Sequence, residues 1–211
     1  MRFLKIAYEN LKNLTFHDFM PLVKSSLFRN DPMIIYLLET SHVEIITDNA
    51  LGKTIIRKGN IEELEEISKH FECIPWEFLC HRYDNVKDFF IASNGNNIQH
   101  ISWIYYQNDP NRFIRLGPSD AEVKYVLTLP PFRGQRIYPK VLKIIAGYLK
   151  QKRFSRVYSF VYEDNYPAIH SMENASFKRI GKIRLRKVFG IQVSRRYLPP
   201  EILRKKPNSF P

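Results

Sequence analysis

Residues 121–139, which read AEVKYVLTLPPFRGQRIYP, decide the fold of this chain. Apolar side chains recur at every second position from Val123 to Leu129, which is the period of a β-strand. The prolines at 130–131 end that strand, and Pro139 is expected to start a helix because proline is tolerated in a first helical turn. The segment therefore predicts a strand, a tight turn and a helix, in that order.

The turn at residues 132–138 is a candidate anion site. The first backbone N–H groups of a helix have no partner within it, and the helix dipole adds positive potential at the same place. Arg133 and Arg136 put two cations beside these groups, so a pyrophosphate is a natural ligand. An ordinary turn with two solvent-facing arginines fits the same residues, and the turn alone does not decide between the two interpretations.

The rest of the chain predicts short strands and helices on both sides of this segment. Upstream, we expect helical structure over 1–29, a turn at 30–32, strands at 33–38 and 42–47, and a loop at 48–52. A strand at 54–57 should follow, then a helix from the Asn60 cap to about residue 71 and a short helix from Pro75. Strands at 88–92 and 98–107, joined by a turn at 93–97, complete this part. Downstream, we expect a strand at 156–161, a helix at 165–175 and two strands within 178–197. Such an order predicts an α/β fold with a mixed sheet.

The segment resembles the GNAT superfamily of acyl-CoA-dependent N-acyltransferases. In that superfamily a strand is followed by a turn Arg/Gln-x-x-Gly-x-Gly/Ala and a helix, then by a strand, a helix opening with Asn, and a Gly-Phe pair. Here the turn runs from Arg133, the asparagine is Asn165 and the pair is Ser176-Phe177. The resemblance implies a mixed, mostly antiparallel central sheet with flanking helices and a splayed parallel strand pair. Residues 53–211 would form this GNAT-like domain, and residues 1–52 an N-terminal extension packed on it.

The resemblance also implies a binding site for acetyl-CoA as co-substrate. Backbone groups of the strand would contact the pantetheine arm, and the amides of the turn would hold the pyrophosphate. The residues so implied are Leu127, Thr128, Leu129, Arg133, Gly134, Gln135, Arg136, Ile137, Tyr138, Asn165 and Ser171. Arg136 and Tyr138 occupy the two small positions of the family turn, so their side chains must point away from the ligand or take part in binding it.

Glu122 is the candidate general base. Direct acyl transfer requires a neutral amine, so a carboxylate or a water chain must accept its proton. Several relatives carry a glutamate eleven residues before the first residue of the turn, as Glu122 stands before Arg133. A solvated glutamate at a strand start is the plain alternative. Many relatives also place a tyrosine seven residues after the asparagine as a general acid. Met172 stands there and cannot donate a proton, and Ser171 or Tyr166 could replace it.

His100 and Trp103 precede this strand and could line the pocket of the acceptor. Strict alternation puts them on opposite faces, so at most one would do so, and a core or surface role is the alternative for each. Relatives with a similar turn suggest a small-molecule amine such as an amino sugar as the acceptor. No metal is expected, although Cys73, Cys80 and His81 leave a zinc site as an alternative.

Charge and composition limit the remaining functional classes. The net charge is +12, and residues 165–211 hold 11 basic and two acidic residues, which indicates an anionic partner. That partner could be coenzyme A, or an acyl carrier protein as the donor. A nucleic-acid-binding domain or a degenerate, non-catalytic member of the family would also fit this charge, and a homodimer is open. Neither a signal peptide nor a spanning apolar stretch is expected, so we predict a cytoplasmic protein.

Overall fold

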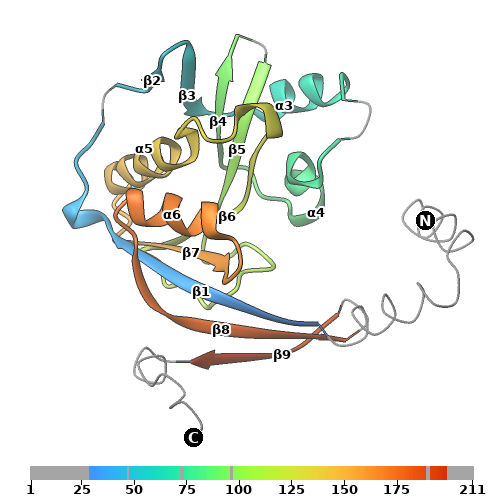
Figure 1. Cartoon of the computed structure of the whole chain (residues 1–211), viewed down its shortest axis with the longest axis vertical. Helices are drawn as coiled ribbons and strands as arrows, with labels where there is room; N and C mark the ends of the chain where they lie inside the picture. The colour runs from blue at the N-terminus through green and yellow to red at the C-terminus, as the bar shows by residue number, and fades with distance from the viewer. Residues whose placement is uncertain (1–28, 47, 72–73, 96, 189–190, 199–211) are drawn as a thin grey trace, which may run out of the picture. The chain divides into compact units, whose positions relative to one another are not determined.

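The computed structural model describes residues 29–46, 48–71, 74–95, 97–188 and 191–198 (Figure 1). The chain divides into two compact units, which are residues 34–180 and a smaller unit of residues 1–33 and 181–211. All the site residues discussed below belong to the larger unit. The helix expected over residues 1–29 lies outside the described residues except for Arg29, which begins β1.

The larger unit is built on a mixed sheet with the strand order β2-β3-β4-β5-β6-β7-β1. The strands are β1 (Arg29–Glu39), β2 (Ala50–Leu51), β3 (Thr54–Lys58), β4 (Phe89–Asn94), β5 (Asn97–Tyr105), β6 (Asp120–Thr128) and β7 (Arg156–Tyr162). Each pair from β2 to β6 is antiparallel, whereas β6 and β7 are parallel. The predicted fold class, mostly antiparallel with one parallel pair, is confirmed.

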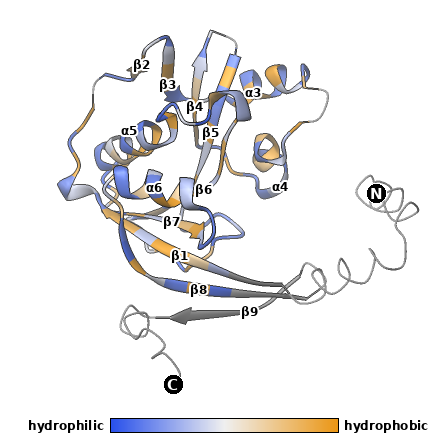
Figure 2. Cartoon of the chain, in the orientation of Figure 1, coloured by the Kyte–Doolittle hydropathy of each residue, from blue (hydrophilic) through white to orange (hydrophobic). Residues whose placement is uncertain are grey.

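Helices cover both faces of the sheet (Figure 1). One face carries α3 (Ile61–Ser68), the 3-10 helix η2 (Trp76–Leu79) and α4 (Cys80–Asp84), and the other carries α5 (Ile137–Gln151) and α6 (Tyr166–Asn174). We call these faces the α4 side and the α5 side. Hydrophobic and hydrophilic residues are interspersed along α5 (Figure 2), and its buried residues, such as Val141 and Ile145, pack into the core on the α5 side. A second buried cluster, with Leu64 and Trp103, lies on the α4 side.

Two strands follow α6 in the chain. These are β8 (Lys178–Val188) and β9 (Ile191–Leu198), which pair antiparallel from Lys182↔Leu198 to Val188↔Ile191. Two further short 3-10 helices are η1 (Thr40–His42) and η3 (Pro130–Phe132). The strands expected within 178–197 are thus confirmed.

Several predicted boundaries are wrong. The turn expected at 30–32 belongs to β1, because proline and the residue before it both suit an extended backbone. The strand expected at 42–47 is absent from the described residues 43–46, which follow η1 without regular structure. Helix α3 ends at Ser68 rather than 71. Helix α5 begins at Ile137, two residues before the proline, because Arg136 adopts a left-handed conformation that turns the chain into the helix.

A bulge at Tyr125 divides β6 into two halves. Tyr125 has φ 52°, and the register with β5 shifts between Trp103↔Lys124 and Ile101↔Leu127. Before the bulge, Val123 packs on the α5 side. After it, Tyr125 and Leu127 pack against the cluster on the α4 side. The uninterrupted alternation expected from Val123 to Leu129 is therefore wrong, because one extra residue reverses which side chains face which side.

Candidate active site

The parallel strands β6 and β7 pair over only part of their length. Their register runs from Asp120↔Arg156 to Val123↔Ser159, whereas β6 continues to Thr128 and β7 to Tyr162. Beyond Val123 and Ser159 the two strands separate, and we call this opening the splay. The closed end is reinforced by the Ser159 hydroxyl, which donates to the carbonyl oxygen of Val123 at 2.9 Å. Strand edges that leave each other in this way present backbone groups to a ligand.

The turn after β6 presents an exposed, basic helix start. Arg133, Gly134, Gln135 and Arg136 are all exposed, and the side chain of Arg136, the N-cap of α5, makes no capping hydrogen bond. The first amides of α5 therefore receive no cap from that residue, and α5 is long enough for a full dipole. Arg133 Nε donates to the carbonyl oxygen of Thr128 at 3.1 Å, which ties the start of the turn to the end of β6.

Positive φ angles mark two positions where this chain lacks the family glycine. Arg136 has φ 57° and Ser176, after α6, has φ 66°. Left-handed backbone favours glycine because a Cβ is unfavourable there. The backbone at Arg136 thus adopts a conformation that favours glycine, although an arginine occupies it. Gly134 is also left-handed, with φ 78°.

His100 of β5 holds the end of β6 in place through a contact on the α5 side of the sheet. It is completely buried, and its ring nitrogens lie 2.7 Å from Thr128 Oγ1 and 2.7 Å from Ser102 Oγ. Burial lowers its pKa to about 3, so the imidazole is neutral at physiological pH. Its ring stacks on Tyr138 of α5, with ring centroids 5.4 Å apart. The histidine thereby joins β5, the end of β6 and the first turn of α5.

Helix α6 starts next to the open end of the splay. The Asn165 side chain accepts the N–H of Ala168 at 3.2 Å and caps the helix. The Ser171 hydroxyl donates to the Pro167 carbonyl at 2.8 Å, within the helix. Met172, at the position of the family tyrosine, is buried in the core on the α5 side.

Glu122 and Lys124 lie on the α4 side of β6. They pair with Tyr105 and Trp103 of β5, and directly paired residues of neighbouring strands point to the same side. Glu122 is completely buried, and its Oε2 accepts the N–H of Phe113 at 3.1 Å. Its Oε1 lies 3.4 Å from the same N–H, so the carboxylate faces the loop at Phe113.

Lys124 brings a cation to an aromatic cluster beside the splay. Its Nζ lies 4.3 Å from the ring centroids of both Phe113 and Tyr125, and it donates to the carbonyl oxygen of Asn111. An ammonium over aromatic faces is favourable, the more so where water is excluded. Trp76, about half exposed, meets the Tyr125 ring edge-on at 4.4 Å, so the cluster reaches the surface.

Asp84 of α4 anchors the loop between β5 and β6 over these side chains. Its two oxygens accept Tyr105 Oη at 2.7 Å and Asn111 Nδ2 at 2.6 Å. Burial raises the pKa of Tyr105, and the hydrogen bond to Asp84 raises it further, so the phenol stays protonated. The loop is thereby held against Glu122 and Lys124 on the α4 side.

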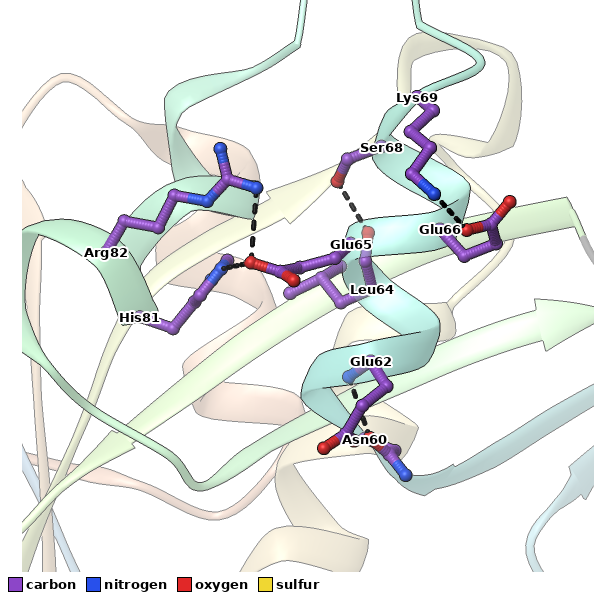
Figure 3. Close-up of polar contacts among 9 residues, drawn as sticks. All are labelled: Asn60, Glu62, Leu64, Glu65, Glu66, Ser68, Lys69, His81 and Arg82. Carbon is purple, nitrogen blue, oxygen red and sulfur yellow. Dashed lines mark hydrogen bonds and ion pairs between the residues drawn. The ribbon is translucent and has the colours of Figure 1, made fainter.

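Helix α4 is itself positioned by α3 (Figure 3). Glu65 of α3 lies 3.3 Å from His81 Nε2 and 3.2 Å from Arg82 Nη2 on α4. Asn60 caps α3 by accepting the N–H of Glu62 at 2.8 Å, as the sequence predicts. These contacts fix the helix that carries Asp84.

The two candidates on β5 point to opposite sides, one to each core. Trp103 is completely buried on the α4 side, and its indole Nε1 donates to the carbonyl oxygen of Glu77 at 2.6 Å. His100 faces α5. Both stand behind the site rather than at its surface, and an acceptor contact for either stays a prediction. Sequence reasoning missed Lys124, whose period of two from Glu122 was a usable signal. It also missed Asp84 and Asn111, which are brought together only by the fold.

Metal-ligating side chains do not gather in the part of the chain that the structure describes. No group of three or more His, Cys, Asp and Glu side chains there could hold a metal ion. Cys73, one of the three residues of the alternative zinc site, lies outside that part. No helix among the described ranges is long and apolar enough to cross a membrane.

Solved structures share this fold at low sequence identity. A GCN5-related N-acetyltransferase from Sphaerobacter thermophilus matches with a TM-score of 0.53 and 14% identity, covering 84% of this chain and 58% of that one. An acetyltransferase of the GNAT family from Colwellia psychrerythraea matches with a TM-score of 0.52 and 15% identity, covering 72% and 53%. This chain thus spans less than two thirds of the length of either protein. At such low identities, the matches show a shared fold only.

A third match is the glucosamine N-acetyltransferase region of a fungal multi-domain β-N-acetylglucosaminidase. It has a TM-score of 0.54 and 11% identity, and it covers 81% of this chain and 22% of that one. No curated protein matches the sequence. The family model described as Acetyltransferase (GNAT) family matches residues 59–177, which is more than half of the chain and holds β6, the turn, α5, β7 and α6. The chain therefore belongs to the GNAT acetyltransferase family.

Proposed function

We propose that this protein is an N-acyltransferase that moves an acetyl group from acetyl-CoA directly to the primary amine of a small molecule such as an amino sugar. The observation that carries the proposal is the splay, which opens beyond Val123 and Ser159 and leads to the exposed helix start at Arg136. An amide-bearing arm ending in phosphates suits both parts, since the strand edges offer hydrogen bonds and the turn offers positive charge.

The turn and the open end of β6 would hold the donor. Backbone groups of Leu127, Thr128 and Leu129 would bind the pantetheine arm, and the first amides of α5, at Ile137 and Tyr138, would bind the pyrophosphate. Arg133 and Arg136 add charge beside the phosphates, while Gly134 and Gln135 shape the turn. Asn165 uses its Oδ1 to cap α6, so its Nδ2 is the group we assign to the donor. Ser171 completes this set.

Glu122 would accept the proton of the acceptor amine. It lies on the α4 side, beside the closed end of the splay, where the acyl group would arrive. Because the carboxylate is completely buried beneath Phe113, the proton reaches it through a bridging water or after that segment of the loop moves. Met172 offers no proton to the departing thiolate, so a general acid at the family position has no counterpart here.

The acceptor would bind on the α4 side. Trp76 and Tyr125 supply an aromatic surface there. Such a surface can pack against the apolar face of a sugar ring. The glucosamine N-acetyltransferase region among the structural matches supports an amino sugar as the first acceptor to test. The cytoplasm remains the compartment we propose, and a homodimer remains open to test.

Two measurements test the proposal. Calorimetry should detect acetyl-CoA binding to the full chain, and a thiol-release assay over a panel of amino sugars, amino acids and polyamines should detect transfer. Absence of binding at millimolar acetyl-CoA contradicts the proposal, unless acetyl-acyl carrier protein supports transfer instead. Binding with no transfer to any amine identifies the second candidate, a non-catalytic CoA-binding protein, which the buried Met172 favours.

A further inference from the structure

Tyr138 bridges two parts of the site. It stands in the first turn of α5, where the family has a glycine or alanine, and its ring is half-buried against the core on the α5 side. The ring stacks on His100 of β5 with centroids 5.4 Å apart and planes at 29°. Since both nitrogens of His100 are held by hydrogen bonds, the surface on which Tyr138 rests is fixed.

The other end of the Tyr138 side chain reaches the closed end of the splay. Its hydroxyl shares a hydrogen bond with the side chain of Ser159. Ser159 in turn donates to the Val123 carbonyl, and Val123↔Ser159 is the last pair before β6 and β7 separate. The ring therefore crosses from β5 to β7 on the α5 side, at the point where β6 and β7 part.

The direction of the bound donor follows from the order of these features along β6. The basic turn adjoins the open end at Thr128, and the closed end at Val123 is five residues away, about 16 Å of strand. On the proposed function, phosphates at the turn and the arm in the splay put the acyl group next to the closed end. There it meets Tyr138 on one side of the sheet and Glu122 on the other.

We propose that the Tyr138 side chain closes the α5 side of the splay and restricts the donor to short acyl groups such as acetyl. This inference rests on the proposed function and assigns its preference for acetyl to one side chain. A ring anchored at its face and at its hydroxyl cannot swing aside without losing both contacts, and close-packed interiors do not absorb added methylenes. His100 is then a positioning residue, which acts through Tyr138.

The test compares donors of increasing length in the full-length protein. Wild type, Tyr138→Ala and Tyr138→Phe are assayed for kcat/KM with acetyl-, butyryl- and hexanoyl-CoA. Wild type should prefer acetyl-CoA. Tyr138→Ala should raise the ratio of hexanoyl to acetyl activity at least about ten-fold, because a pocket discriminates each added methylene by roughly that factor or more. Tyr138→Phe keeps the stacking on His100 but loses the hydroxyl contact with Ser159, so its ratio should lie between those of wild type and Tyr138→Ala.

Tyr148→Ala is the matched control. It removes a half-buried ring from the same helix, but that ring packs on Phe90, away from the splay, so the donor ratio should stay as in wild type. If Tyr138→Ala does not fold, Tyr138→Leu supplies the same comparison with a smaller, apolar side chain. A wild type that uses hexanoyl-CoA as well as acetyl-CoA, or an unchanged ratio in the folded variant, overturns this inference alone. A wild type that binds none of the donors overturns the proposed function with it.

Discussion

At the scale of single residues, Arg136 carries a backbone cost that a glycine would relieve. Its φ is 57° and its side chain makes no cap. We expect Arg136→Gly to raise the free energy of unfolding by about 0.5–1 kcal/mol, because relief of left-handed strain outweighs the added chain entropy of glycine. Urea denaturation measures this. The neighbouring Gln135→Gly, at a position without positive φ, should lower stability instead, and a loss of stability in Arg136→Gly contradicts the reasoning.

Glu122→Gln tests the base role with almost no change of shape. The amide cannot accept the amine proton, so we expect kcat to fall about 100-fold while acetyl-CoA affinity stays unchanged. Steady-state kinetics and calorimetry measure the two quantities. Glu65→Gln, a change at a carboxylate that joins α3 to α4, serves as control and should leave kcat within a few-fold. Activity retained by Glu122→Gln would return Glu122 to a structural role.

His100 predicts a pH dependence of stability. Its pKa is lowered from 6.5 in the unfolded chain to about 3 in the folded protein. Between these values the unfolded state binds one more proton, so stability is full above pH 6.5 and falls on acidification, by up to about 1.4 kcal/mol per pH unit. His100→Gln should reduce by about one the number of protons taken up on unfolding between pH 3 and pH 6.5, as measured from the pH dependence of the free energy of unfolding. Parallel profiles for wild type and His100→Gln contradict this assignment.

The residues of the site were only partly predictable. The turn from Arg133 to Tyr138 stands out locally because a strand end, prolines and arginines adjoin in sequence. The network of Asp84, Asn111 and Lys124 does not, because its members lie up to 40 positions apart and meet only once the sheet forms. The sequence also shows no sign of the contact between His100 and Tyr138, which depends on how α5 packs.

At the scale of elements, Asn165 has two separable tasks. It caps α6, and we assign its amide nitrogen to the donor. Asn165→Ala should lower the free energy of unfolding by about 1 kcal/mol and weaken acetyl-CoA binding, whereas Asn165→Asp should keep the cap and lose only affinity. Asn60→Ala, which removes the cap of α3, should cost similar stability without changing affinity. Equal affinity in wild type and Asn165→Asp would leave Asn165 as a cap alone.

Elements with strong local signals were predicted well. The hairpin of β4 and β5 follows from its Gly- and Asn-rich turn, and the start of α3 follows from its Asn60 cap. The start of α5 was misplaced because proline suits more than one position of a first turn. The bulge in β6 left no mark in the sequence, since Tyr125 is a common strand residue and its left-handed φ is imposed by the pairing with β5.

At the scale of the whole molecule, the net charge of +12 predicts that salt weakens donor binding. Exposed arginines at the turn are screened as the Debye length falls from about 10 Å at 0.1 M salt to about 3 Å at 1 M. Titrations of acetyl-CoA should show a Kd that rises several-fold over this range, with a smaller rise for a variant with Arg133→Gln and Arg136→Gln together. S-acetylpantetheine, which lacks the phosphates, should show little dependence. A Kd independent of salt would argue against charge at the turn.

The fold as a whole could be predicted because the order of elements and the turn motif agree with one family. The splay could be expected only through that resemblance, since β6 and β7 carry no period that says where two parallel strands part. Their separation after four residue pairs is a property of the folded sheet.

The bulge at Tyr125 divides β6 into two halves whose side chains alternate in opposite phase between the two faces of the sheet. Even-numbered residues before it look toward the α4 side, and odd-numbered residues after it do so. On the proposed function, one strand would therefore serve two roles through separate sets of positions, with Glu122 on the first half and the stretch from Leu127 to Leu129 on the second. On that assignment, mutations in the first half can broaden the range of acceptors while donor binding by the second half stays unchanged. A single-residue deletion at Tyr125 would merge the two registers and should abolish both at once.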